Sequence, residues 1–139
     1  MCVFICVFFL LFILFFLISL ISHGPFHPDC LYFAIQAEKT ASTGTIHYLH
    51  SHGFPLTAVL GALFVRGGQL LGAKDPVMCV NAMSVVFASL CLPVLFLLIR
   101  KVTDAMTAAV AVMLFALSPI YLSNSVYGNS HMPALFFLL

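Results

Sequence analysis

The chain has 139 residues, of which 63% are hydrophobic and only 6% are charged. Soluble proteins contain roughly 45–50% apolar and about 25% charged residues, so this composition excludes a water-soluble globule and indicates an integral membrane protein. The formal net charge is +1, which gives nucleic-acid binding no electrostatic support, because no basic surface is available to neutralise a run of phosphates.

Residues 1–21 are the first predicted membrane span. The stretch is uncharged, and at 1.5 Å per residue it is long enough to cross about 30 Å of hydrocarbon. A cleaved signal peptide is the alternative, but this stretch lacks the positive start, the short apolar core and the small-residue cleavage site of such peptides. We therefore expect a membrane anchor.

Residues 22–75 are predicted to form a first outer loop with two helices in the membrane interface. In the first helix, Asp29 can act as the cap of residues 30–43, and Gly44 can end it. The second helix, residues 55–72, is amphipathic, with apolar side chains at helical spacing. Its Arg66 would cost about 2.5–3.5 kcal/mol at mid-membrane, so we expect this helix to lie in the interface rather than to cross.

Two further spans are predicted to form a helical hairpin. Residues 76–99 are uncharged and end at a basic pair, which suits a helix C-terminus at a lipid boundary. Residues 105–120 follow after a short turn, where Asp104 can cap the helix and Pro119 marks its far end. With a cytoplasmic N-terminus, the positive-inside rule places the basic pair in the cytoplasm and both polar loops on the other side.

The chain ends with a second outer loop, residues 121–131, and the start of another apolar helix at residues 132–139. Eight residues span only about 12 Å, which is too short for a bilayer of about 30 Å. The sequence is therefore expected to be a single truncated domain, the N-terminal fragment of a larger multispanning protein, and to be inactive on its own.

Six histidines raise the possibility of a metal site, because His47, His50 and His52 lie close together. No nearby cysteine or acid completes a ligand set, and the HExxH pattern is absent. A loop of interfacial histidines is the favoured interpretation, so we expect neither a metal nor a cofactor. Walker A, GxGxxG and GxSxG patterns are also absent, which leaves nucleotide-driven chemistry without support.

The order of several short motifs is informative. HPD at residues 27–29 precedes an aromatic-rich helix, and GFPL at residues 53–56 opens the amphipathic helix. LLIRK at residues 97–101 ends the uncharged span, and TAAVAVMLFALSP follows at residues 107–119. This order resembles the start of a GT-C membrane glycosyltransferase, in particular the RgtA/B/C/D-like and protein-mannosyltransferase-like group.

The resemblance implies an all-α, polytopic fold and an enzyme of the plasma membrane or endoplasmic reticulum. Such an enzyme passes a sugar from a polyprenyl-phosphate donor to a glycan or protein acceptor on the non-cytoplasmic face. By position, Asp29 would be the general base toward the acceptor hydroxyl. Arg66 would contact the lipid phosphate, although anchoring at the interface is an equal alternative. Tyr32, Asn129 and His131 complete the predicted substrate-binding set.

The second outer loop departs from the family pattern, because it has no acid before the next apolar segment. His131 occupies this region and is a candidate hydrogen-bond donor or proton carrier. The departure weakens any metal site shared by the two loops. Asn124, Tyr127 and Asn129 are candidates for an acceptor pocket, although loop polarity alone also explains them.

The sequence is also compatible with two other functions. The first is a transporter or channel fragment, since polar residues near the membrane also form substrate pathways. Against it, Asn81 is the main strongly polar residue inside a predicted span. A non-catalytic membrane subunit is the other, because the alanines of residues 105–111 allow close helix contact.

Overall fold

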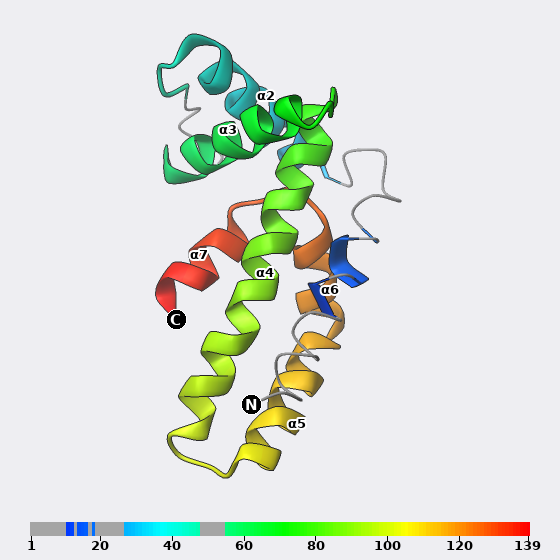
Figure 1. The fold of residues 1–139 in the computed structure, drawn as a ribbon, viewed down its shortest axis with the longest axis vertical. Coiled ribbons are helices and arrows are strands. Elements are labelled where there is room, and N and C mark those ends of the chain that lie inside the picture. Colours follow the sequence, from blue (N-terminus) through cyan, green and yellow to red (C-terminus); the bar gives the residue numbers. More distant parts are fainter. Residues whose placement is uncertain (1–10, 13, 17, 19–26, 48–54) are drawn as a thin grey trace.

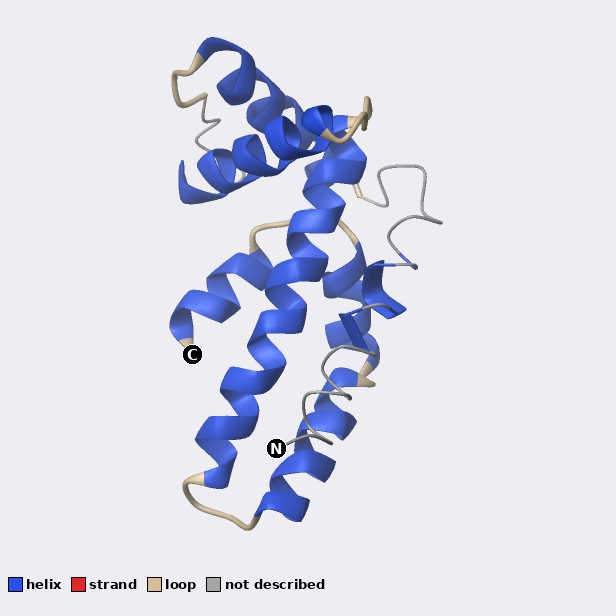
Figure 2. Cartoon of the chain, in the orientation of Figure 1, coloured by secondary structure: helices blue, strands red, loops and turns tan. Residues whose placement is uncertain are grey.

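The computed structural model describes residues 11, 12, 14–16, 18, 27–47 and 55–139. Every regular element in these residues is a helix, so the all-α prediction is confirmed for the described part of the chain (Figures 1 and 2). The predicted first span lies mostly outside the described residues. Of its positions, the six that are described are helical.

Helix α4 (Pro76–Arg100) is the central element, because each of the other helices from residue 28 onward packs against it (Figure 1). It begins at the cap Asp75, whose carboxylate accepts a hydrogen bond of 2.9 Å from the Val77 amide. Its 25 residues have a mean hydropathy of 2.6 in the most apolar window, and they extend over about 37 Å. Helix α4 is therefore long and apolar enough to cross a membrane.

Helices α2 (Pro28–Thr43) and α3 (Pro55–Leu70) lie side by side across the upper end of α4 (Figure 1). A glycine permits their close approach, because a Cβ atom at Gly61 would lie 2.8 Å from the Cβ of Ala37. The faces that meet carry small side chains, while Leu63 and Leu70 of α3 are 62% and 89% exposed. The helix predicted over residues 55–72 is thus present, with its large leucines turned away from the protein.

The start of α2 differs from the prediction, because its cap is His27 and not Asp29. His27 has an extended backbone (φ −143°, ψ 146°), and its Nδ1 accepts a hydrogen bond of 3.3 Å from the Asp29 amide. A residue before proline is restricted to such extended conformations, and Pro28 suits the first helical position. The end of α2 is as predicted, since Gly44 adopts a left-handed conformation (φ 71°) there.

The segment predicted as one helix over residues 105–120 is in fact two helices. Helix α5 (Ala105–Ala116) begins at Asp104, whose carboxylate accepts two backbone hydrogen bonds as predicted. Helix α6 (Pro119–Val126) begins at the cap Ser118, and the pair is bent by 63°. Pro119 has no amide hydrogen and would clash with the carbonyl of the preceding turn, so it starts a helix rather than ending one. Part of the predicted outer loop is therefore helical.

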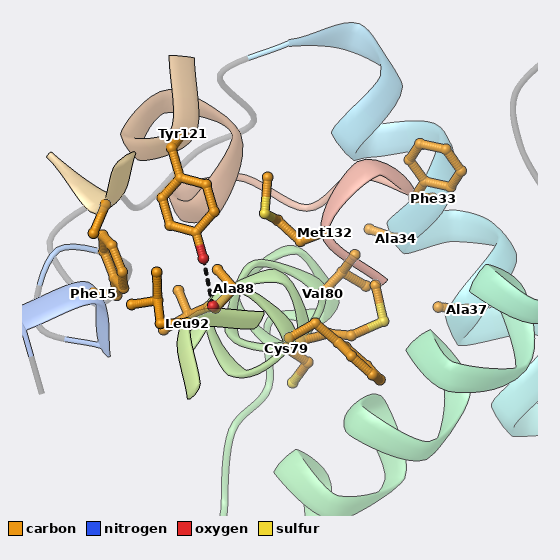
Figure 3. Close-up of a cluster of buried hydrophobic side chains, with 14 of the residues drawn as sticks. Phe15, Phe33, Ala34, Ala37, Cys79, Val80, Ala88, Leu92, Tyr121 and Met132 are labelled. Carbon is orange, nitrogen blue, oxygen red and sulfur yellow. Dashed lines mark hydrogen bonds between the residues drawn. The ribbon is translucent and has the colours of Figure 1, made fainter. Parts of the chain in front are cut away.

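The chain then reaches α7 (His131–Leu138), which packs against α4. Figure 3 shows how α6 is fixed to α4: the Tyr121 hydroxyl donates a hydrogen bond to the Ala88 carbonyl. The Tyr121 ring lies between two phenylalanines, with centroid distances of 4.6 Å to Phe115 and 6.1 Å to Phe15. The buried core thus runs along α4 and places residues 127–130, between α6 and α7, directly below α2 and α3.

Candidate functional site

The first turn of α2 and the segment after α6 come together at one end of α4. We call residues 27–30 and 127–131 the outer junction. Burial raises the pKa of the Tyr127 hydroxyl most, the charges of Cys30 and Asp29 raise it further, and a hydrogen bond with Asn129 lowers it. The placement of the two polar loops on one face of a membrane stays a prediction.

Buried polar groups of α4 hold residues 127–131 in place. The Asn81 side-chain oxygen accepts a hydrogen bond of 2.6 Å from the Gly128 amide, and the Ser84 hydroxyl accepts one of 3.2 Å from the Asn129 amide. Asn81 and Ser84 are both fully buried. Asn81 and Ser84 of α4 thus hold residues 128 and 129 in place.

Asn129 is part of this attachment as well. Its Oδ1 accepts a hydrogen bond of 2.8 Å from the His131 amide, and its Nδ2 donates one of 3.0 Å to the Asn124 carbonyl. An oxygen that accepts from an amide at a helix start acts as a cap, so Asn129 organises the beginning of α7. Its side chain is buried and engaged with the backbone, which leaves it poorly placed to bind a substrate.

Asp29 presents its carboxylate at the surface of the outer junction. It lies in the first turn of α2, and its side chain is 42% exposed. Its Oδ2 is 3.2 Å from Nδ1 of His27. Tyr32 follows three residues later and is exposed to the same extent, so the two side chains share one face of the helix. Asp29 and Tyr32 are the predicted site residues that the structure brings together.

Arg66 lies far from this pair. Its Nε and Nη2 donate hydrogen bonds of 2.9 and 2.7 Å to the Ala41 carbonyl, in the last turn of α2. Ala41 is twelve residues beyond Asp29, or about 18 Å along a helix. The Arg66 guanidinium therefore binds a backbone carbonyl at the C-terminal end of α2 and connects α3 to that end. Nothing in the sequence pattern signals this contact, because it joins residues 25 positions apart.

His131 lies at the entrance of α7 beside a cavity of about 520 Å³ at the bend between α5 and α6. Its side chain is exposed, and within the described residues its imidazole has no hydrogen-bond partner. The polar neighbours Ser118 and Asn124 bond to their own helix or turn, with donor distances of 2.8 and 2.9 Å. Among the residues that line this cavity, His131 is therefore the one whose polar side chain can bind a ligand. The lining residues are Phe115, Ser118, Ile120, Tyr121, Asn124, His131, Met132 and Leu135.

No pattern in the sequence predicted this cavity. It forms because the chain breaks at residues 117–118 and restarts as α6, so that the bend leaves space beside α7. The Ser-Pro pair was the available signal, since serine is a favoured cap and proline a favoured first residue of a helix.

The histidine-rich stretch lies only partly within the described residues. The ring of His47 is 3.0 Å from the Thr43 hydroxyl and 3.2 Å from the Thr45 hydroxyl, while His50 and His52 lie outside the described residues. Within the described ranges, no group of three histidines, cysteines or acids gathers closely enough to hold a metal ion.

Comparisons of the chain with protein-family models, with curated proteins and with solved structures give no match. The interpretation of the outer junction therefore rests on its residues and their geometry.

Proposed function

We propose that the protein is a multi-pass membrane glycosyltransferase, in which Asp29 is the general base that activates the acceptor. The observation that carries the proposal is the position of its carboxylate. It lies in the first turn of α2, and its side chain is 42% exposed. A half-exposed acidic group beside one end of an apolar helix suits proton removal at a membrane surface.

In the proposed reaction, a hydroxyl of a glycan or protein acceptor attacks the anomeric carbon of a polyprenyl-phosphate sugar. The bond from that carbon to the phosphate oxygen breaks, and the electron pair leaves with the lipid phosphate. The hydroxyl proton passes to the Asp29 carboxylate. Attack from the face opposite the leaving group inverts the anomeric centre. Asp29 contributes by accepting the proton as the new bond forms.

Two further residues are assigned to substrate binding in this proposal. Tyr32 lies one turn beyond Asp29 on the exposed face of α2, where its ring offers a flat surface to a sugar and its hydroxyl a hydrogen bond. His131 has an exposed imidazole beside the cavity at the helix bend, where it can donate a hydrogen bond to an oxyanion. We assign Arg66 to the α2–α3 contact and Asn129 to the start of α7.

The proposal also includes a position in the membrane. Helix α4 crosses, and the bent α5–α6 pair returns, so that α2 and α3 lie at the non-cytoplasmic surface. Leu70 at the end of α3 and Leu71 directly after it, which are 89% and 90% exposed, then contact lipid. The basic residues Arg100 and Lys101 lie at the opposite end, in agreement with the positive-inside rule.

The test is sugar transfer in membranes that contain the full-length protein, with a panel of radiolabelled polyprenyl-phosphate sugars. Asp29→Asn should lower transfer by about 10²-fold or more, because general-base catalysis contributes about 10²–10⁴-fold. Asp75→Asn is the matched control, since it makes the same change at the cap of α4, where asparagine also caps well.

Transfer by Asp29→Asn within about threefold of the wild type would remove Asp29 from the catalytic role. If the wild type forms no product from any donor, the transferase proposal fails. In that case a transporter or a non-catalytic membrane subunit takes its place.

A further inference from the structure

Another cavity lies beside the upper half of α4 (Figure 1) and shares no lining residue with the outer junction. Its volume is about 730 Å³, against about 520 Å³ for the cavity at the helix bend. Three segments form its walls: the second half of α3 with the connection that follows, the first turns of α4, and the pair Phe12 and Phe16. Leu63, Leu71 and Gly72 are exposed at its rim. The cavity therefore opens at the surface, and we call it the α3–α4 groove.

Small and apolar residues give the α3–α4 groove its shape. A Cβ atom at Gly67 would meet nothing within 4 Å, so this position faces free space, whereas a Cβ atom at Gly68 would collide with Sγ of Cys79. The rings of Phe12 and Phe16 are stacked, with centroids 6.4 Å apart and planes 9° apart. Every lining residue has an apolar side chain or none. The groove is therefore suited to an apolar chain and not to a sugar.

The length of the groove corresponds to one leaflet of a bilayer. Its α4 residues run from Met78 to Val86, which is about 12 Å along a helix. The hydrocarbon core of a bilayer is about 30 Å thick, so each leaflet contributes about 15 Å. In the proposed membrane position, α4 begins at the non-cytoplasmic surface. The groove then runs from that surface into the leaflet, in the direction of a lipid acyl chain.

A cation lies at the surface end of the groove. Lys74 follows directly after the last lining residue of the connection between α3 and α4, is exposed, and forms no ion pair with any described residue. Asp75 is held at the start of α4 by a hydrogen bond of 2.9 Å from a backbone amide, and Arg66 is bound to the Ala41 carbonyl. The Lys74 ammonium is thus available to an anion, and a phosphate group is the anion that lysine commonly binds.

We propose that the α3–α4 groove binds one diacyl phospholipid of the non-cytoplasmic leaflet, with an acyl chain along Met78–Val86 and the headgroup phosphate at Lys74. The inference goes beyond the transfer reaction and rests on the proposed membrane position alone. Inside a membrane, association depends on packing contacts rather than on the hydrophobic effect. A chain enclosed by three segments of the protein gains such contacts, which makes this lipid more tightly held than its neighbours.

Photo-crosslinking tests the occupant. The full-length protein in dodecyl maltoside micelles is mixed with phosphatidylglycerol that carries a diazirine in one acyl chain, illuminated, digested and mapped by mass spectrometry. Cross-links should fall on residues 63–72 and 78–86, and unlabelled phosphatidylglycerol should remove them. Diacylglycerol with the same chains should need a concentration about two- to fivefold higher, because it lacks the phosphate that pairs with an exposed lysine.

Two variants test the two ends of the site. Gly67→Leu places a side chain in the free space of the groove and should lower cross-linking by about threefold or more, because it removes the packing contacts of the lipid chain. Its matched control, Ala105→Leu, adds the same side chain at an exposed position near the other end of α4. Lys74→Gln should abolish the difference between phosphatidylglycerol and diacylglycerol, whereas Lys101→Gln, at the opposite end of α4, should preserve it.

Cross-links that are spread evenly over the exposed faces of the protein, or that persist in Gly67→Leu, overturn the inference. Removal of the cross-links by polyprenyl phosphate but not by phosphatidylglycerol also overturns it, because the groove then belongs to the sugar donor. Sugar transfer without cross-links in the groove would refute the phospholipid site and leave the transferase in place. Cross-links in the groove without product from any donor would refute the transferase and leave the phospholipid site established.

Discussion

Replacing Gly128 by alanine tests whether residues 127–131 are held against α4 as described. A Cβ atom at this position would lie 2.6 Å from Cγ1 of Val80 and 3.1 Å from Oδ1 of Asn81. Contacts below 3.0 Å are not tolerated, and Val80 is a short, branched side chain that is only 1% exposed. The segment must therefore shift away from α4.

The expected loss of stability has two parts. Forcing an extra methyl group into a packed core costs about 1–3 kcal/mol, and losing the hydrogen bond from the Gly128 amide to Asn81 costs about 1 kcal/mol. The sum is about 2–4 kcal/mol. For a chain of 139 residues, with an unfolding entropy of about 2.1 cal/mol/K per residue, this lowers Tm by about 7–14 °C.

Thermal unfolding in detergent micelles, followed by circular dichroism at 222 nm, measures the effect. Gly67→Ala is the matched control: a Cβ there meets nothing within 4 Å, and alanine is about 1 kcal/mol better than glycine inside a helix. Its Tm should rise by about 3 °C. A Gly128→Ala protein that melts at or above the wild-type temperature would show that the segment does not rest on α4 as described.

Three smaller predictions follow from single contacts. Arg66→Lys keeps the charge but loses the fork on the Ala41 carbonyl, so the free energy of unfolding should fall by about 0.5–1.5 kcal/mol, and hydrogen exchange should speed up in the last turn of α2. Tyr121→Phe removes the hydroxyl that donates to Ala88 and should lower stability by a similar amount in the same thermal assay. Hydrogen bonds from the Thr107 side chain and backbone lower the pKa of Asp104. The stabilisation of α5 by this carboxylate is therefore complete above the ordinary aspartate pKa and is lost only as the pH falls through the lower pKa of the folded state. A carboxylate ¹³C titration with an ordinary or raised midpoint would contradict this cap.

Local signals in the sequence predicted several helix boundaries correctly. Gly44 ends α2 because glycine readily takes the left-handed conformation there, and Asp104 caps α5 through its own carboxylate. Helix α4 follows from a long uncharged run. In each case, the cause lies within a few residues of its effect, so a pattern along the chain is enough to reveal it.

The errors at His27 and Pro119 have a different origin. At both places, a proline begins a helix and the residue before it is the cap, whereas the prediction has Asp29 as a cap and Pro119 as the end of a helix. The contacts that build the site were not predictable, since they join distant positions. Asn81 meets Gly128 across 47 residues, and Arg66 meets Ala41 across 25.

The central claim is that Asp29 and residues 127–131 share one side of the membrane, opposite the turn after α4. Single cysteines at Ser42, Thr103 and Ser130, in a cysteine-free protein, would be probed with a small membrane-impermeant thiol reagent on sealed, right-side-out membranes. Labelling at positions 42 and 130, but not at 103, is the expected result. Labelling at 42 and 103 without 130 would mean that α3 crosses the membrane, which separates the two loops and contradicts a shared site.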